Sequence, residues 1–217
     1  LQVKHLFDTV YMEKMATKDA QIAALQAQIN PHFLNNTLEM MNWQARMNND
    51  IEVCKMIESL GTVLDSSMNR RNDRLVRLAD ELRCGDAFLY IMSMRFGQRL
   101  KVERNIDESL QQIYVPQLIL QPLLENAIVH GVSELKETGM IAVTGKETED
   151  AIYITVKDNG NGMPETIIRQ LEEIRENGIL KEKEHIGIFN IQQRLLLLYG
   201  KEYGLTVEHV KPSGTAV

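Results

Sequence analysis

The chain has 217 residues, of which 44% are hydrophobic and 25% charged, with a formal net charge of −6 and a pI of about 5.5. This acidic balance argues against a nucleic-acid-binding protein, because such proteins gain affinity by neutralising phosphates. No apolar run approaches the roughly 20 residues needed to cross a bilayer, and no signal peptide is visible. Cys54 and Cys84 form no C-x-x-C pair, which fits a reducing cytosol and argues against structural zinc. Because the chain starts at Leu1, we expect it to be a fragment of a longer protein.

Composition divides the chain near residue 97. Only two of the thirteen glycines, Gly61 and Gly85, precede this point, and no clear strand pattern is visible before it. The remainder carries the other glycines, with β-branched runs between them. We therefore expect an all-helical first half and an α+β second half.

Residues 1–30 place Met15, Ile22 and Ile29 at a spacing of seven, with Lys18 where an apolar residue is wanted. This pattern predicts a short, imperfect coiled-coil helix.

Two amphipathic helices are predicted after Pro31, joined by a turn at 48–50. Their apolar stripes are Leu34, Leu38, Met41 and Ala45, then Val53, Ile57, Leu60 and Leu64. A hairpin with this much apolar surface typically dimerises into a four-helix bundle. A third helix is predicted to stop at Gly97, with one face formed by Leu78, Leu82, Leu89, Met92 and Phe96.

The second half is predicted to form an α/β sandwich, with the strands in one sheet and the helices on one side. The expected strands are 99–106, 140–146, 151–158 and 205–210, and the expected helices are 116–130, 165–177 and 188–199. Gly131 is expected to stop the first of these helices and Pro122 to kink it.

The proline at 31 bears on the histidine that follows it. Proline disrupts a helix, so it detaches His32 from the upstream heptad, where strict continuation would bury it. In the next helix His32 and Asn36 lie opposite the apolar stripe and are expected to be exposed. His32 is then either a surface histidine beside a kink or an exposed imidazole that can act as a nucleophile. Trp43 falls on the same side, where it is either covered within the assembly or offers a docking anchor.

Three more segments place polar residues or glycines where a ligand could bind. Asn126 and His130 lie at i and i+4 in an apolar helix. They form either a solvated edge of that helix or a site where the amide oxygen of Asn126 binds Mg²⁺. "DNGNG" at 158–162 is either a tight turn or a loop whose glycines admit a flat ligand beside the aspartate. Gly187 opens a helix whose free N–H groups favour phosphate. The charged segment before it, 163–185, is long enough to act as a lid.

The order and spacing of "LQAQINPHFLNNTL", "LILQPLLENAIVHG", "VKDNGNGMP", "HIGIFNIQQRL" and "PSGT" resemble sensor histidine kinases of the LytS/YesM type over nearly the whole chain. The resemblance implies a dimeric helical bundle with the phosphoacceptor, then an ATP-binding domain of the gyrase/Hsp90/histidine-kinase/MutL fold. It implies autophosphorylation with ATP and Mg²⁺ and transfer to an aspartate of a response regulator. It also implies a homodimer and a cytoplasmic location, below a transmembrane sensor in the bacterial inner membrane. The domains expected are a signalling helix at 1–30, dimerisation and phosphotransfer helices at 31–96, and the ATP-binding domain at 97–217.

The same resemblance assigns roles to single residues. His32 matches the phosphorylated histidine, and Asn36 either orients a water for dephosphorylating the regulator or only solvates the kink. Asn126 matches the asparagine that holds Mg²⁺, and Asp158 matches the aspartate that reads the adenine amine. The other residues expected to bind the nucleotide are His130, Gly160, Gly162, Gly187, Asn190 and Thr215.

Some positions depart from the family pattern. His185 stands where a glycine is common and Asn35 where an aromatic residue is usual, and the chain ends at Val217, where such domains run on through a final strand. ATP-hydrolysing relatives carry a glutamate four residues before the Mg²⁺ asparagine, as general base for water. Here that residue is Pro122, which favours a kinase over a plain ATPase. A non-catalytic nucleotide-binding scaffold is a further alternative, disfavoured by the intact site residues.

Overall fold

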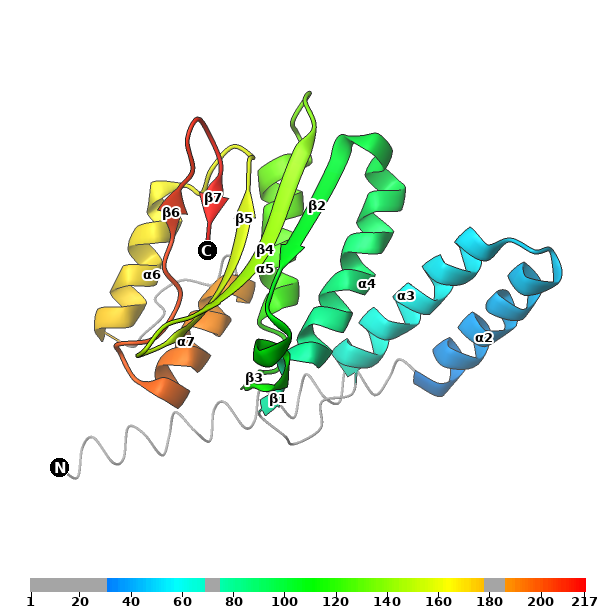
Figure 1. The fold of residues 1–217 in the computed structure, drawn as a ribbon, viewed down its shortest axis with the longest axis horizontal. Coiled ribbons are helices and arrows are strands. Elements are labelled where there is room, and N and C mark those ends of the chain that lie inside the picture. Colours follow the sequence, from blue (N-terminus) through cyan, green and yellow to red (C-terminus); the bar gives the residue numbers. More distant parts are fainter. Residues whose placement is uncertain (1–30, 69–74, 178–185) are drawn as a thin grey trace. The chain divides into compact units, whose positions relative to one another are not determined.

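The computed structural model describes residues 31–68, 75–177 and 186–217 (Figure 1). The predicted coiled coil at 1–30, and with it the break expected before Pro31, lies outside the described residues, as does His185. The chain forms two compact units, the first ending at Gly61 and the second beginning at Thr62. None of the helices in the described ranges is long and apolar enough to cross a membrane.

The first unit contains a helical hairpin, as predicted. Its helices α2 (Pro31–Met47) and α3 (Ile51–Met68) are joined by the turn at 48–50, and the last residues of α3 belong to the second unit. The Arg46 guanidinium donates to the Glu58 carboxylate at 2.7 Å and so ties the two helices together. Both side chains are exposed, so this ion pair adds little stability.

Much apolar surface of this hairpin remains exposed. Of the predicted stripe on α2 only Ala45 is buried, whereas Met41 is 53% exposed. On the side that carries His32, Trp43 is 71% exposed. Other large apolar side chains exposed on the hairpin are Phe33, Met40, Met47 and Ile51. An apolar surface of this extent indicates a protein–protein contact.

The second unit contains a short strand that the sequence does not predict. β1 (Leu75–Arg77) pairs antiparallel with β3 (Tyr114–Pro116). The expectation of no strand before residue 97 is therefore wrong, because three residues with a partner far along the chain leave no local pattern. α4 (Leu78–Phe96) follows and ends at Gly97, as predicted. Gly97 has a φ of 58°, and its N–H donates to the Ser93 carbonyl, which closes the last helical turn.

The main sheet has five strands in the order β2-β4-β5-β7-β6, with β2 parallel to β4 and the other neighbours antiparallel. The strands are β2 (Leu100–Asn105), β4 (Gly139–Glu147), β5 (Ile152–Asp158), β6 (Glu208–His209) and β7 (Thr215–Ala216). The first three match prediction. The strand predicted at 205–210 shortens to two residues, and β7 is not predicted. Both short strands depend on pairing within the sheet and carry no alternating pattern of their own.

Helices cover one face of this sheet, which confirms the predicted sandwich (Figure 1). They are α5 (Leu120–Asn126), which continues into the π-helical turn η3 (Ala127–Val132), then α6 (Glu165–Asn177) and α7 (Ile186–Tyr199). Two expectations about the first helix are wrong. It starts at Leu120 and not at 116, so Pro122 lies in the first turn, where its missing N–H has no acceptor to lose and no kink is required. Gly131 lies inside η3 and does not stop the helix. A glycine is needed at this position for another reason, because the loop that carries Asp158 approaches it closely.

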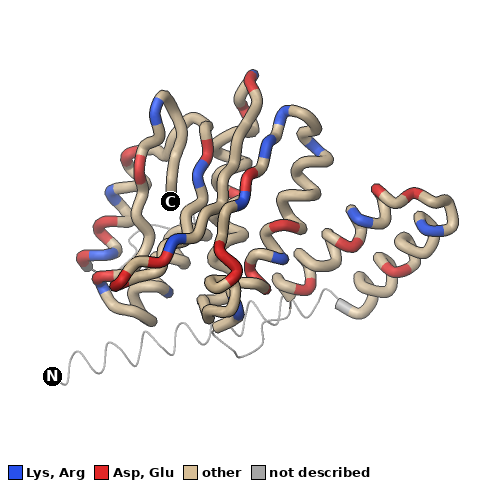
Figure 2. The backbone as a smooth tube through the Cα atoms, in the orientation of Figure 1, with Lys and Arg blue, Asp and Glu red and all other residues tan. Residues whose placement is uncertain are grey.

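The core lies between the sheet and these helices. Its most buried side chains include Leu78 of α4, Leu124 of α5 and Phe189 of α7, packed against Ile141 and Val156 of the sheet. Lys and Arg are interspersed with Asp and Glu along the described elements (Figure 2).

Candidate functional site

Asp158 is the last residue of β5 and is buried, with 5% of its surface exposed. Its Oδ1 accepts a hydrogen bond from the Gly160 N–H at 2.7 Å, and the Thr215 backbone also donates to the carboxylate. Burial raises the pKa of the Asp158 carboxyl, and these two backbone bonds oppose part of that rise. These two donors leave lone pairs of the carboxylate that can accept further hydrogen bonds.

The loop after Asp158 packs against the end of the helical segment that carries Asn126. At Gly160 a Cβ would lie 2.2 Å from the carbonyl carbon of Gly131, and at Gly131 a Cβ would lie 2.9 Å from Asp158 Oδ1. Both positions therefore require glycine. The sequence interpretation was that Gly160 admits a ligand. In the structure, the space that a Cβ of Gly160 would fill is occupied by the backbone of Gly131.

The C-terminal segment closes around the same carboxylate. Gly214 has a φ of 126°, and a Cβ there would lie 2.1 Å from the Asp158 carbonyl oxygen. The next residue, Thr215, is buried and donates to Asp158. Gly162 also has a positive φ, of 85°. The structure thus brings Asp158, Gly160 and Thr215 together, and their role in binding nucleotide stays a prediction.

Asn126 and His130 lie on the continuous helical segment that ends beside this loop. Asn126 is half-buried at the end of α5, and His130 is exposed within η3. Gly131, the residue after His130, makes the contact with Asp158 and Gly160. The helix and the aspartate loop therefore form one assembly.

Gly187 and Asn190 lie in the first turns of α7, and both are exposed. A Cβ at Gly187 would lie 3.4 Å from the Cβ of Pro122, so the start of α7 packs on the first turn of α5. Pro122 therefore provides a packing surface at the position where ATP-hydrolysing relatives carry a base. Of the predicted lid at 163–185, the part described is largely helix α6.

His32 and Asn36 belong to the other unit. Both are exposed on α2, and the Asn36 amide nitrogen lies 3.3 Å from His32 Nδ1. The exposure predicted from helical phase is confirmed. The contact involves Nδ1 of the histidine ring and not the other ring nitrogen, Nε2.

Two family models match the chain: "Histidine kinase" over residues 20–100, and "Histidine kinase-, DNA gyrase B-, and HSP90-like ATPase" over residues 113–217. Sensor histidine kinase YesM of Bacillus subtilis is 35% identical over 216 residues, which are 100% of this chain and 36% of that protein. Sensor protein LytS of the same organism is 32% identical, and sensor histidine kinase YpdA of Escherichia coli is 34% identical. Each alignment covers 95% of this chain and 34% of the relative.

The chain belongs to the histidine kinase family. It spans about a third of the length of the curated relatives it matches. Among solved structures, the histidine kinase domain from Erythrobacter litoralis EL346 blue-light activated histidine kinase aligns with 91% of this chain and 90% of that chain, at 16% identity and a TM-score of 0.47. That likeness is too loose to inform the site.

Sequence reasoning missed two polar residues that hold the segments of the candidate site. Asn159 accepts a hydrogen bond from the Met140 N–H at 2.7 Å and donates to the Thr138 carbonyl at 3.0 Å, which fastens the aspartate loop to the start of β4. Glu81 is buried in α4 and accepts hydrogen bonds from the backbone at the start of α5. The available signal was helical phase, since Glu81 falls on the same face as Leu78 and Leu82.

The raised pKa of Asp158 predicts a dependence of stability on pH. In the window between the ordinary aspartate pKa and the raised one, the folded protein binds a proton that the unfolded chain does not, so this contribution is present at low pH and lost as the pH rises. We expect the free energy of unfolding of the wild type to fall, relative to Asp158→Asn, as the pH rises through that window. Urea titrations without nucleotide at a series of pH values measure this difference. A constant difference across the series would contradict the prediction.

Proposed function

We propose that this chain is the autophosphorylating part of a sensor histidine kinase, which transfers the γ-phosphoryl group of ATP to His32. The observation that carries the proposal is an exposed histidine on a helical hairpin, in one chain with a buried aspartate at the end of a strand in an ATPase-type sandwich. The phosphoryl group then passes to an aspartate of a response regulator.

We assign the phosphoryl acceptor to His32 Nε2, with the ring proton on Nδ1, where it donates to the Asn36 side-chain amide turned so that its oxygen faces the ring. The Nε2 lone pair attacks the γ-phosphorus, the N–P bond forms as the P–O bond to ADP breaks, and the Nδ1 proton is lost to solvent. The imidazole is exposed on α2 and is therefore accessible for this attack.

The adenine end of ATP is assigned to Asp158. A buried carboxylate that already accepts two backbone N–H groups gains from one more donor, and the exocyclic amine of adenine supplies it. Gly160, Gly162 and Thr215 form the backbone around this position. The phosphates are assigned to the side of Asn126 and His130 and to the first turns of α7, at Gly187 and Asn190, where N–H groups favour anions.

Magnesium fits the donor chemistry of Asn126. Its amide oxygen is a neutral, hard donor on a half-buried helix end, and Mg²⁺ in nucleotide sites takes one or two protein ligands together with phosphate oxygens and water. Within the described ranges no three His, Cys, Asp or Glu side chains gather as a self-sufficient metal site. When bound, the ion would neutralise charge on the triphosphate.

Two alternatives are disfavoured by specific residues. A plain ATPase needs a base for water, and Pro122, packed beside Gly187, has no group that accepts a proton. A non-catalytic scaffold would not need an exposed histidine next to an amide. Incubation with γ-labelled ATP separates the three cases. A histidine kinase acquires an acid-labile, base-stable label on the protein, and a plain ATPase releases the label as free phosphate. A scaffold does neither.

The proposed partners follow from the hairpin. Its exposed apolar side chains suit a second copy of the chain in a four-helix bundle. Those on the side of α2 that carries His32, above all Trp43, suit a receiver domain that must approach the histidine. We also propose that the chain lies on the cytoplasmic side of the bacterial inner membrane, below a transmembrane sensor. The division at 1–30, 31–96 and 97–217 remains our assignment of the functional domains.

His32→Gln should abolish incorporation of label from γ-labelled ATP, because the amide is no nucleophile. Folding and ATP binding should be nearly unchanged, since the side chain is exposed. Circular dichroism and nucleotide titration serve as controls. Label retained at His130 or His209 in the variant would defeat the assignment.

Asn36→Ala should slow dephosphorylation of the partner regulator, because the amide next to His32 Nδ1 is placed to orient a water. The same change should alter autophosphorylation much less than His32→Gln does. Unaltered kinase and phosphatase rates in this variant would show that Asn36 merely solvates the surface.

Asp158→Asn should weaken the binding of adenosine and of ATP together, by roughly 10- to 100-fold, the loss expected for a hydrogen bond to a charged group. Asn126→Asp should weaken MgATP by about tenfold or more and spare adenosine, because it places a negative charge beside the triphosphate. Isothermal titration with both ligands measures the two patterns. Equal affinities of both variants and the wild type would remove this nucleotide site.

A further inference from the structure

Glu81 is a buried carboxylate that no step of the proposed reaction uses. Only 5% of its surface is exposed. Its Oε1 accepts from the Leu118 N–H at 2.6 Å, and its Oε2 accepts from the Ile119 and Leu120 N–H groups at 2.9 Å and 3.1 Å. These N–H groups lead into the first turn of α5, where the helix itself offers no acceptor. The side chain therefore caps α5 from another helix, and the positive end of the helix dipole compensates its charge.

The capped turn is held from a second side. Leu118 has a φ of 58°, an uncommon conformation for a residue with a branched side chain, and its carbonyl accepts from Arg194 Nη2 of α7 at 3.2 Å. The peptide groups around Leu118 are thus bound by Glu81 of α4 and Arg194 of α7. A strained turn persists only where its surroundings hold it.

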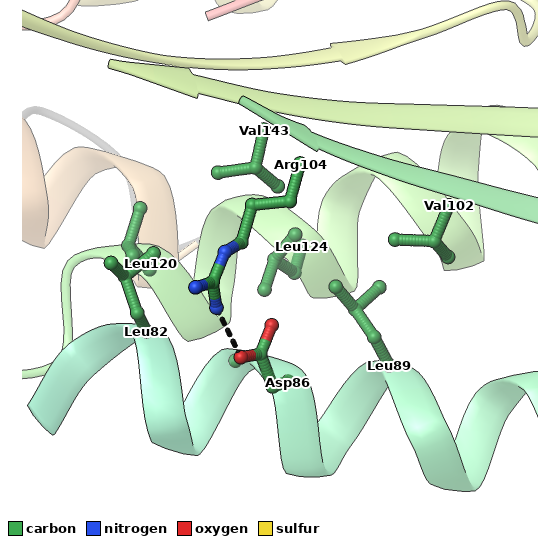
Figure 3. Close-up of a pocket in the computed structure, with 9 residues that line it drawn as sticks. Leu82, Asp86, Leu89, Val102, Arg104, Leu120, Leu124 and Val143 are labelled. Carbon is green, nitrogen blue, oxygen red and sulfur yellow. Dashed lines mark hydrogen bonds and ion pairs between the residues drawn. The ribbon is translucent and has the colours of Figure 1, made fainter. Parts of the chain in front are cut away.

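Beyond this turn α5 lies along α4. A Cβ at Gly85 would lie 3.0 Å from Leu124 Cδ1, so the two helices approach closely. Figure 3 shows side chains of α4 and α5 lining one pocket, Leu82 and Leu89 from the first helix and Leu120 and Leu124 from the second. Glu81 therefore fixes the point at which α5 begins, and the packing carries that register to its end.

We propose that Glu81 is a positioning residue that places Asn126 for the nucleotide. Asn126 is the last residue of α5, about 9 Å along the axis from Leu120 at 1.5 Å per residue. Backbone hydrogen bonds join the turns of α5 and η3 into one segment, so a shift of the first turn of α5 moves its last residue. A neutral amide at position 81 would place its NH2 group against at least one of these three N–H donors. The inference rests on the proposed role of Asn126.

The test compares Glu81→Gln with Asp86→Asn as a matched control. Asp86 is an exposed carboxylate of α4, and it is paired with Arg104 of β2 and not hydrogen-bonded to the start of α5 (Figure 3). Titration calorimetry of the full chain with MgATP and with adenosine, well below the melting temperature, gives the ratio of the two affinities. Backbone amide exchange by NMR over 120–126 gives a second readout that requires no ligand.

Glu81→Gln should lower the affinity for MgATP relative to adenosine by about tenfold, which corresponds to one charge-assisted hydrogen bond. It should also speed exchange over 120–126. Asp86→Asn should change neither quantity, because its exposed ion pair does not reach the start of α5. A ratio for Glu81→Gln equal to that of Asp86→Asn would overturn the proposal, because a purely stabilising cap changes the melting temperature only.

Two further outcomes are covered. If Glu81→Gln does not fold, Glu81→Asp decides the question, because it keeps the charge on a shorter side chain and should show a smaller loss of the same kind; an unchanged ratio would overturn the proposal. If the wild type binds neither ligand, the proposed nucleotide site has failed. Amide exchange then tests the positioning of α5 alone, and equal rates in Glu81→Gln and Asp86→Asn would overturn it.

Discussion

The close backbone contact between Gly131 and Gly160 is the constraint on which the candidate nucleotide site depends. Gly131 lies in the last turn of the helical segment that carries Asn126 and His130, and Gly160 follows Asp158 in the loop after β5. A single Cβ on either residue would collide with the other segment. The contact therefore joins a helix and a strand end that would otherwise be separate pieces of the sandwich. The π-helical form of η3 suits this role, since π turns are frequent at functional sites.

Buried carboxylates lie at both ends of the segment formed by α5 and η3. Glu81 receives the N–H groups at its start, and Asp158 lies against its end and receives N–H groups from the loop and from Thr215. Burying a charge is costly unless hydrogen bonds compensate it. At Glu81 three backbone donors do so. At Asp158 the raised pKa shows that compensation is incomplete, and an amine donor from a ligand would complete it. Glu81, with three backbone donors, therefore suits a structural role, whereas Asp158, with two, suits the recognition of a ligand amine.

The helical hairpin differs from the second unit in how much apolar surface it leaves exposed. It leaves Trp43, Met41 and other large apolar side chains exposed, and its internal polar contact is a surface ion pair. Such a unit gains little from its own packing and is suited to assembly with a partner. His32 lies on the exposed side, where a phosphoryl donor and a phosphoryl acceptor could both reach it. The two units thus divide the proposed chemistry, with recognition of nucleotide in one and the nucleophile in the other.

Much of this protein could be predicted from its sequence. Helical periodicity located α2, α3 and α4, alternation located β2, β4 and β5, and the motifs around His32, Asn126 and Asp158 indicated the histidine kinase family. These features are local, or depend on short motifs in a fixed order, so a single sequence carries them. Helical phase alone placed His32 on an exposed face.

Only the tertiary structure decided the rest, because it depends on contacts between segments distant in the chain. The pairing of β1 with β3 has no local pattern, and α5 begins at Leu120 because Glu81, on another helix, accepts its first N–H groups. Gly131 reads as a helix stop in sequence, yet the loop at Gly160 requires it. Pro122 reads as a kink, yet it lies in a first turn against Gly187. In each case the residue type was visible in the sequence, and its partner across the fold determined what it does.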